Sequence, residues 1–144
     1  MSIKIAIGSD HAGFELKQHL VDYLKNKNYS VNDKGCYSTE RADYPDYGHA
    51  VANAVLNKEA DLGILMCGSG NGINITANKH KGIRAALCWN SEIAALARQH
   101  NDANVLVLPA RYISLEEAHK CVDAFLTEKF EGGRHQARIE KIDL

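Results

Sequence analysis

Short apolar runs alternate with segments whose apolar residues recur every three or four positions, and this alternation repeats five times along the 144-residue chain. Runs rich in β-branched residues predict buried strands over residues 3–8, 29–35, 61–67, 83–88 and 104–108. The periodic segments predict five helices. The first covers residues 14–27, the second begins at Pro45 or Asp46 and ends near 57, and the third covers 73–79. The fourth begins at 91, and the fifth covers 115–130. A basic tail, residues 134–144, is predicted to be partly helical. Alternating strands and helices indicate βαβ units, so we expect a parallel sheet covered by helices on both faces.

Two helix starts carry capping signals. Ser91 precedes an apolar stripe and is a good N-cap. Ser114 and Glu117 have the spacing of a capping box, in which the two side chains satisfy each other's backbone N–H groups. Both signals predict helices that begin close to these residues.

Composition indicates an ordinary single globular domain. Hydrophobic residues make up 45% and charged residues 24%, and the net charge of −1 disfavours broad binding to nucleic acid. No apolar run approaches the roughly 20 residues that span a bilayer, and no signal peptide is evident, so we expect a cytoplasmic protein. The chain has four cysteines, Cys36, Cys67, Cys88 and Cys121, and they lack CxxC spacing. The histidines lack an HExxH pair. We therefore expect reduced thiols and no metal site.

The most informative segment is DLGILMCGSGNG, from Asp61 to Gly72. A buried strand ends at Cys67 and runs through a glycine-rich loop into a helix, an arrangement that points backbone N–H groups at an anion. A thiolate at Cys67 would lie beside that anion site. The structural alternative is a tight turn with an inert, buried cysteine.

The predicted sheet sorts the remaining polar residues into two groups. Ligands of parallel sheets bind at the carboxyl ends of the strands. Asp10 and His11 follow the first strand and Arg111 follows the fifth, so we expect them beside the loop after Cys67.

His100 lies at the end of a helix, followed by Asn101, and therefore belongs to the opposite edge of the sheet. Its structural alternative is a core histidine, because it falls on the apolar stripe. Arg134 and Arg138 are spaced i, i+4 on one helical face, where planar guanidinium groups suit a phosphate, although a solvated face is the bland alternative. If both groups serve one site, either a symmetric dimer shares its sites or the tail folds back.

An ordered set of motifs covers the whole chain and resembles the type B ribose-5-phosphate isomerases and their galactose-6-phosphate and allose-6-phosphate isomerase relatives. The motifs are GSDHAGFELK at 8–17, DKG at 33–35, DYP at 43–45, CGSGNGI at 67–73, ANK at 77–79, GIRAAL at 82–87, RQHNDANVL at 98–106 and EGGRHQAR at 131–138. No single motif is unique, but their order is highly specific.

The resemblance implies a three-layer α/β/α sandwich with a Rossmann-like five-stranded parallel sheet. It implies one domain, residues 1–144, whose basic tail 131–144 contributes to the phosphate site. It further implies a homodimer or dimer of dimers with shared active sites, no metal or other cofactor, and no nucleic acid or membrane partner. The implied reaction interconverts ribose 5-phosphate and ribulose 5-phosphate in the pentose phosphate pathway.

The resemblance also implies residue roles. Cys67 matches the base that moves a proton through a cis-enediolate, and His100 matches the residue that opens the furanose ring. Asp10 and Ser69 are candidates to take the proton of the anomeric hydroxyl. A branch of the family with a glutamate base would place it at Ile73, so this chain follows the cysteine branch. The implied substrate-binding positions are Asp10, His11, Gly68, Ser69, Gly70, Asn71, Gly72, Asn101, Arg111, Arg134 and Arg138.

Two rival interpretations remain at this point. A hexose 6-phosphate could replace the pentose phosphate, with Tyr44 and His11 as candidate determinants of pocket length. A non-catalytic nucleotide-binding α/β module would also have a glycine-rich loop, but the chain lacks the GKS/T of a P-loop and a GxGxxG fingerprint.

Overall fold

The computed structural model describes residues 2–144 and contains one five-stranded sheet. All neighbouring strands pair in parallel, in the order β2-β1-β3-β5-β4. This confirms the predicted parallel sheet and places β3, which carries Cys67, at its centre. The strands are β1 (Lys4–Ser9), β2 (Ser30–Asp33), β3 (Leu62–Cys67), β4 (Ala85–Leu87) and β5 (Val105–Pro109).

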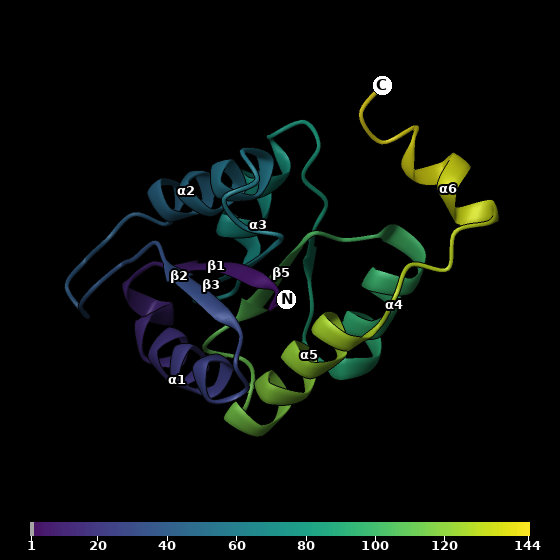
Figure 1. The fold of residues 1–144 in the computed structure, drawn as a ribbon. Helices are drawn as coiled ribbons and strands as arrows, with labels where there is room; N and C mark the ends of the chain where they lie inside the picture. The colour runs from purple at the N-terminus through teal and green to yellow at the C-terminus, as the bar shows by residue number, and fades with distance from the viewer. Residues whose placement is uncertain (1) are drawn as a thin grey trace.

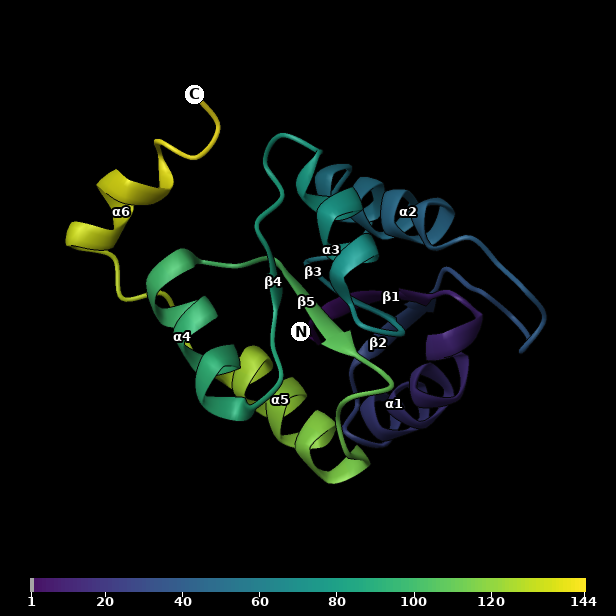
Figure 2. The same cartoon turned by 180° about the vertical axis from the view of Figure 1, so that it is seen from behind.

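Helices cover both faces of the sheet and give three layers (Figures 1 and 2). One apolar cluster joins the sheet to α1, α4 and α5, and a second joins the opposite face to α2 and α3. The expected α/β/α sandwich is therefore confirmed. The helices are α1 (Phe14–Asn26), α2 (Tyr44–Leu56), α3 (Asn71–Asn78), α4 (Ser91–Asn101), α5 (Leu115–Thr127) and α6 (Arg134–Ile139), with a 3-10 turn η1 (His11–Gly13) after β1.

The alternation of side chains along β3 decides what surrounds Cys67. Met66 packs with the cluster of α1, α4 and α5, whereas Cys67, one residue later, packs with the cluster of α2 and α3. Both side chains are buried, with exposures of 0% and 4%. The cysteine therefore points toward the start of α3, which follows directly from the glycine-rich loop.

Several predicted boundaries shift in the structure. Asn90, not Ser91, caps α4, because its Oδ1 accepts a hydrogen bond from the Ile93 N–H at 3.0 Å. Ser114 caps α5 as predicted, at 3.1 Å from the Glu117 N–H. The Glu117 carboxylate instead accepts from the backbone N–H of Ser91 at 2.8 Å. The capping box is thus half formed, and its acidic side chain joins two helices.

The remaining differences concern segment lengths. The glycine-rich loop is shorter than predicted, because α3 already begins at Asn71, and α5 ends at Thr127, not near 130. The edge strand β4 covers three residues where six were predicted. The strand β4 is limited to the three residues that pair with β5, whereas β-propensity had extended the predicted strand to six.

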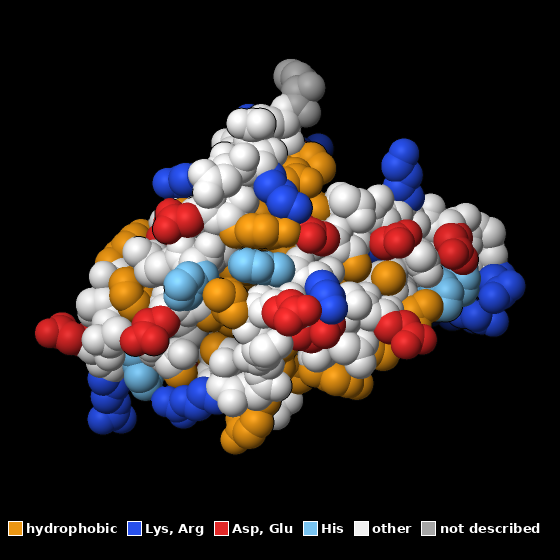
Figure 3. All heavy atoms as spheres, turned by 90° about the horizontal axis from the view of Figure 1, so that it is seen from below, with side chains coloured by type: hydrophobic (Ala, Val, Ile, Leu, Met, Phe, Trp, Pro, Cys, Tyr) orange, Lys and Arg blue, Asp and Glu red, His pale blue; other side chains and the backbone are white. Residues whose placement is uncertain are grey.

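The C-terminal tail extends from the body of the molecule and packs beside the end of α4 (Figures 1 and 2). Within residues 2–144 no helix combines the length and the apolar character needed to cross a membrane. Seen from below Figure 1, acidic and basic side chains intermingle over the outer face, and this face has no basic patch of the kind that binds nucleic acid (Figure 3).

Candidate active site

The loop between β3 and α3 forms the centre of the site. Gly70 adopts a φ of +82°, a left-handed conformation that favours glycine, and a Cβ there would lie 2.5 Å from Leu87 Cδ1. At Gly72 a Cβ would lie 2.6 Å from the ring of Tyr44. Position 70 therefore requires glycine, whereas a side chain at position 72 would displace the ring of Tyr44.

Two predicted residues, Arg111 and Asp10, converge on this loop from neighbouring strands. Arg111, two residues after β5, donates its backbone N–H to the Gly68 carbonyl at 3.0 Å. Its guanidinium lies over the same glycine, since a Cβ on Gly68 would be 3.3 Å from Arg111 Nη1. Asp10 is buried, accepts the Gly13 N–H at 3.1 Å, and lies close enough to Cys67 to affect its ionisation. The predicted convergence at the carboxyl edge is confirmed for Arg111 and Asp10.

His11 lies beside the loop that leads into α2. Its Nδ1 is 3.1 Å from both the carbonyl oxygen and the backbone nitrogen of Ala42. The adjoining hollow, of about 390 Å³, is lined by Arg41, Ala42, Asp43, Asp46 and Tyr47. His11 therefore contacts Ala42, which is one of the residues that line this hollow.

An ion pair between a buried lysine and a partly exposed aspartate, which the sequence did not reveal, holds the first residues of the same loop. Lys17 is fully buried, and its Nζ lies 2.6 Å from Asp33 Oδ2. The other oxygen of Asp33 accepts the Gly35 N–H at 2.9 Å. Because a buried ammonium needs a partner, the pair fixes the start of the loop beside η1 and His11.

The ionisation of Cys67 reflects two opposed influences. Burial raises the pKa of this thiol above its ordinary value, and the negative charge of Asp10 raises it further. Backbone N–H groups of Ile73, Gly70 and Gly72 hydrogen-bond to the sulfur and lower the pKa, but less than burial raises it. In a single copy of the chain the pKa of Cys67 is therefore raised, whereas a thiolate base requires a lowered pKa.

We expect the reactivity of Cys67 to increase with pH. Because the pKa is raised, the thiol predominates at neutral pH, and the thiolate fraction grows as the pH approaches that pKa. Iodoacetamide labelling, followed by mass spectrometry from about pH 6 to about pH 9, should show Cys67 modification that accelerates with pH. Cys88 and Cys121 are internal controls, since burial raises each of their pKa values to about 12. A labelling rate at Cys67 that does not change across this pH range would contradict a raised pKa for its thiol.

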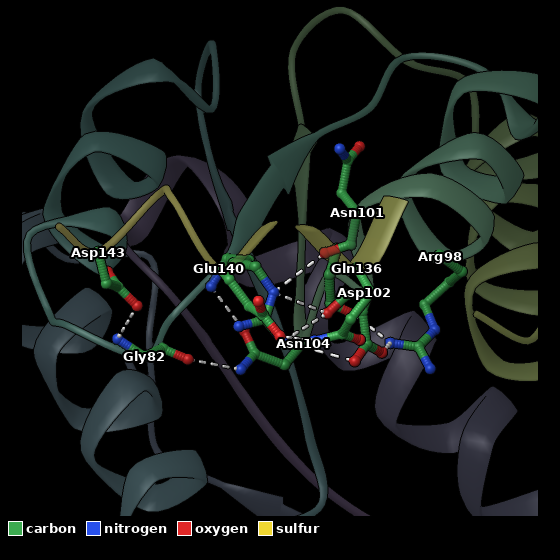
Figure 4. Close-up of polar contacts among 10 residues, drawn as sticks. Gly82, Arg98, Asn101, Asp102, Asn104, Gln136, Glu140 and Asp143 are labelled. Carbon is green, nitrogen blue, oxygen red and sulfur yellow. Dashed lines mark hydrogen bonds and ion pairs between the residues drawn. The ribbon is translucent and has the colours of Figure 1, made fainter. Parts of the chain in front are cut away.

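The second group of predicted residues gathers at the end of α4. Arg84 donates from Nε to the Asn101 carbonyl at 3.0 Å and from Nη2 to the Asp102 carbonyl at 2.9 Å. Arg98 Nη1 lies 3.2 Å from Asp102 Oδ1, across a turn in which Asp102 has a φ of +45°. Figure 4 shows the Asn101 side chain directed away from this network. The two arginines, which sequence reasoning missed, therefore hold the turn and leave the Asn101 amide free.

His100 does not lie in the core, so the structural alternative of a buried histidine is wrong. Its side chain is 39% exposed, and its ring stacks on His135 with centroids 4.3 Å apart. His135 belongs to α6, the short helix that also carries Arg134 and Arg138. The tail thus joins His100 and Asn101 in one group, as the paired arginines suggested. The sequence placed His135 inside the EGGRHQAR motif but gave no sign of this contact.

The two groups lie at opposite edges of the sheet. The loop after Cys67 follows the carboxyl end of β3, whereas α4 ends just before the amino end of β5, which runs parallel to β3. Within one chain, described from residue 2 to 144, the tail packs beside α4 and does not fold back to Cys67. His11 and Arg111 therefore do not meet the tail arginines in a single copy.

One cluster within residues 2–144 has the composition of a metal site. His100, Glu131 and His135 offer ligand atoms within 4.8 Å of one another. However, the two imidazole rings are stacked with their planes only 13° from parallel, so their nitrogen lone pairs lie in two separate, nearly parallel planes and do not converge on one ion. The arrangement suits charge pairing with the shared carboxylate of Glu131, at 4.0 Å and 3.7 Å, better than tetrahedral coordination.

Comparison with known proteins gives a full-length match. The model of the family described as Ribose/Galactose Isomerase matches residues 5–142. Ribose-5-phosphate isomerase B of Escherichia coli is 52% identical over 139 residues, which cover 96% of this chain and 93% of that protein.

Solved structures agree with the computed fold. A ribose 5-phosphate isomerase from Thermotoga maritima superposes with a TM-score of 0.98 at 55% identity and covers 99% of both chains. Ribose-5-phosphate isomerase B from Mycoplasma genitalium, solved with bound ribulose-5-phosphate, gives a TM-score of 0.93 at 50% identity and covers 99% of this chain and 95% of that one.

Proposed function

Since this chain belongs to the ribose/galactose isomerase family, we propose that it interconverts ribose 5-phosphate and ribulose 5-phosphate in the pentose phosphate pathway. The observation that carries the proposal is the buried Cys67 set against the backbone N–H groups of the glycine-rich loop. A relative of 50% identity has been solved with ribulose-5-phosphate bound. A non-catalytic nucleotide-binding module is disfavoured by the same family membership.

Cys67 is the proposed base that transfers a proton between carbon 1 and carbon 2. The intermediate enediolate carries negative charge on oxygen, and we assign its stabilisation to backbone N–H groups of the loop of residues 68–72. The N–H groups that now contact the sulfur favour its thiolate form. Cations brought in by a second copy would lower the pKa of Cys67 further, toward the value that a base requires.

Ring opening precedes this proton transfer, because the aldose phosphate is mainly cyclic. We assign His100 as the acid that protonates the ring oxygen. Ser69 Oγ accepts the Asn71 N–H at 3.2 Å, so its own hydroxyl hydrogen remains available to a relay. Asp10 or Ser69 then receives the proton of the anomeric hydroxyl.

The phosphate is the proposed anchor at the far end of the substrate. Arg134 and Arg138 would bind it together with His11 and Arg111, and Asn101 would bind a sugar hydroxyl. Because one chain keeps these groups at opposite edges of its sheet, we propose a symmetric dimer, alone or paired into a tetramer. In it the tail of residues 131–144 from one copy completes the site of the other.

The purified chain alone, with a chelator present, should convert ribose 5-phosphate to ribulose 5-phosphate. Such turnover would support the isomerase assignment without an unlike subunit or a free metal ion. Allose 6-phosphate and galactose 6-phosphate serve as alternative substrates in the same assay. A kcat/KM higher for either hexose phosphate than for ribose 5-phosphate would reassign the substrate, and activity that requires added metal would contradict the metal-free mechanism.

A further inference from the structure

His135 is the anchor of the tail helix. Among the six residues of α6, all within the described part of the chain, only His135 is buried. Its side chain is 9% exposed, and its ring lies almost parallel to that of His100, at 4.3 Å between centroids and 13° between planes. One face of the His100 ring, the proposed ring-opening acid, is therefore covered by the imidazole of His135.

Glu131 faces both imidazoles from the segment that precedes α6. Its Oε1 lies 4.0 Å from His100 Nε2 and 3.7 Å from His135 Nε2. Glu131 therefore brings one carboxylate group to the same edge of both imidazole rings.

Backbone and side-chain contacts hold Glu131 in this place. Its backbone N–H donates to the Gln99 carbonyl at 3.0 Å, in the last turn of α4. Three residues earlier, Glu128 accepts a hydrogen bond from Gln99 Nε2 at 2.9 Å. The segment is thus fastened to the same helical turn that carries His100.

We propose that Glu131 and His135 are positioning residues for His100, and that the three side chains act as one unit in ring opening. This inference rests on the proposed function. Glu131 faces the Nε2 of His100 and His135 fixes the plane of its ring, so that His100 is oriented to deliver its own proton to the ring oxygen. Neither residue needs to contact the substrate, and neither is needed by the later proton transfer at Cys67.

The charges around His135 favour the neutral form of this residue. Burial lowers the pKa of His135, and the nearby His100 and Arg134 lower it further. Arg138 acts in the same direction, and only Glu131 opposes it. His135 therefore stays neutral near pH 7 and does not repel a protonated ring stacked on it.

The test separates ring opening from proton transfer. Ribulose 5-phosphate has no furanose form, so exchange of its carbon-1 proton with deuterium oxide needs Cys67 but no ring opening. In Glu131→Gln, kcat for ribose 5-phosphate should fall about tenfold or more, since general acids contribute about 10²-fold to 10⁴-fold. The exchange rate, followed by NMR, should stay within about twofold of wild type, because the base is untouched.

Matched variants complete the experiment. Glu140→Gln is the charge control, since Glu140 lies on the same tail but pairs with Gln136, and it should leave both rates unchanged. His135→Asn should lower turnover more than exchange, and His135→Phe, which keeps a flat ring for stacking, should restore part of the loss. Thermal unfolding of each variant checks that the fold is intact.

Either of two results would overturn the inference. Equal losses of turnover and exchange would mean that the cluster merely docks the tail, and unchanged turnover in Glu131→Gln and His135→Asn would remove any role in ring opening. The wild-type chain tests the proposed function separately, because a failure of that function would abolish its own turnover and exchange.

Discussion

Replacement of Cys67 by alanine should lower kcat for ribose 5-phosphate by about 10³-fold and leave KM nearly unchanged, because a general base commonly contributes about 10²-fold to 10⁴-fold. Alanine has no group that can accept the proton of carbon 2. The glycine-rich loop, Arg111 and the tail arginines remain in place to bind the substrate. Steady-state kinetics with ribose 5-phosphate would measure the two constants.

A second cysteine provides a matched control for this variant. Cys36 is as buried as Cys67, at 4% exposure, but its sulfur lies 3.4 Å from the Ser38 carbonyl, and the proposed reaction does not use it. Cys36→Ala should retain near wild-type kcat. Turnover above a few per cent of wild type in Cys67→Ala, measured beside this control, would exclude Cys67 as the base.

Mixing two inactive variants should regenerate activity if the sites are shared. Cys67→Ala damages the half built around the glycine-rich loop, and His100→Asn damages the half built around the end of α4. In a heterodimer, one shared site carries both substitutions and the other carries neither. A one-to-one mixture refolded together should therefore recover about a quarter of the wild-type activity by random pairing in a twofold dimer.

The control mixture combines Cys67→Ala with Asp10→Asn. Both residues lie in the same half of the site, so no pairing restores an intact site and no activity should return. Differently tagged copies would verify that heterodimers form. Confirmed heterodimers without recovered activity in the first mixture would rule out the shared site.

The central strand shows why much of this site could be predicted. The apolar run before Cys67 and the glycines after it identify a strand, a tight loop and a helix from neighbouring residues alone. Because parallel strands end at a common edge, Asp10, His11 and Arg111 could be assigned to the same place before any coordinates were known.

The end of α4 shows where prediction failed. Periodicity put His100 on an apolar stripe, but that stripe ends at the surface, where the ring meets His135 from a helix later in the chain. The contacts of Arg84 and Arg98 with Asp102, which hold the turn after α4, produce no local pattern in the sequence either. Contacts between side chains distant in sequence have no period to detect.

By itself, the sequence determined the α/β class, the parallel pairing, the loop after Cys67 and the resemblance to an isomerase family, since these follow from local order and spacing. The tertiary structure alone decided the strand order, the stacked histidines beside Glu131 and the raised pKa of Cys67. Strand order depends on which distant apolar faces pack together, and ionisation depends on how completely that packing removes a group from water.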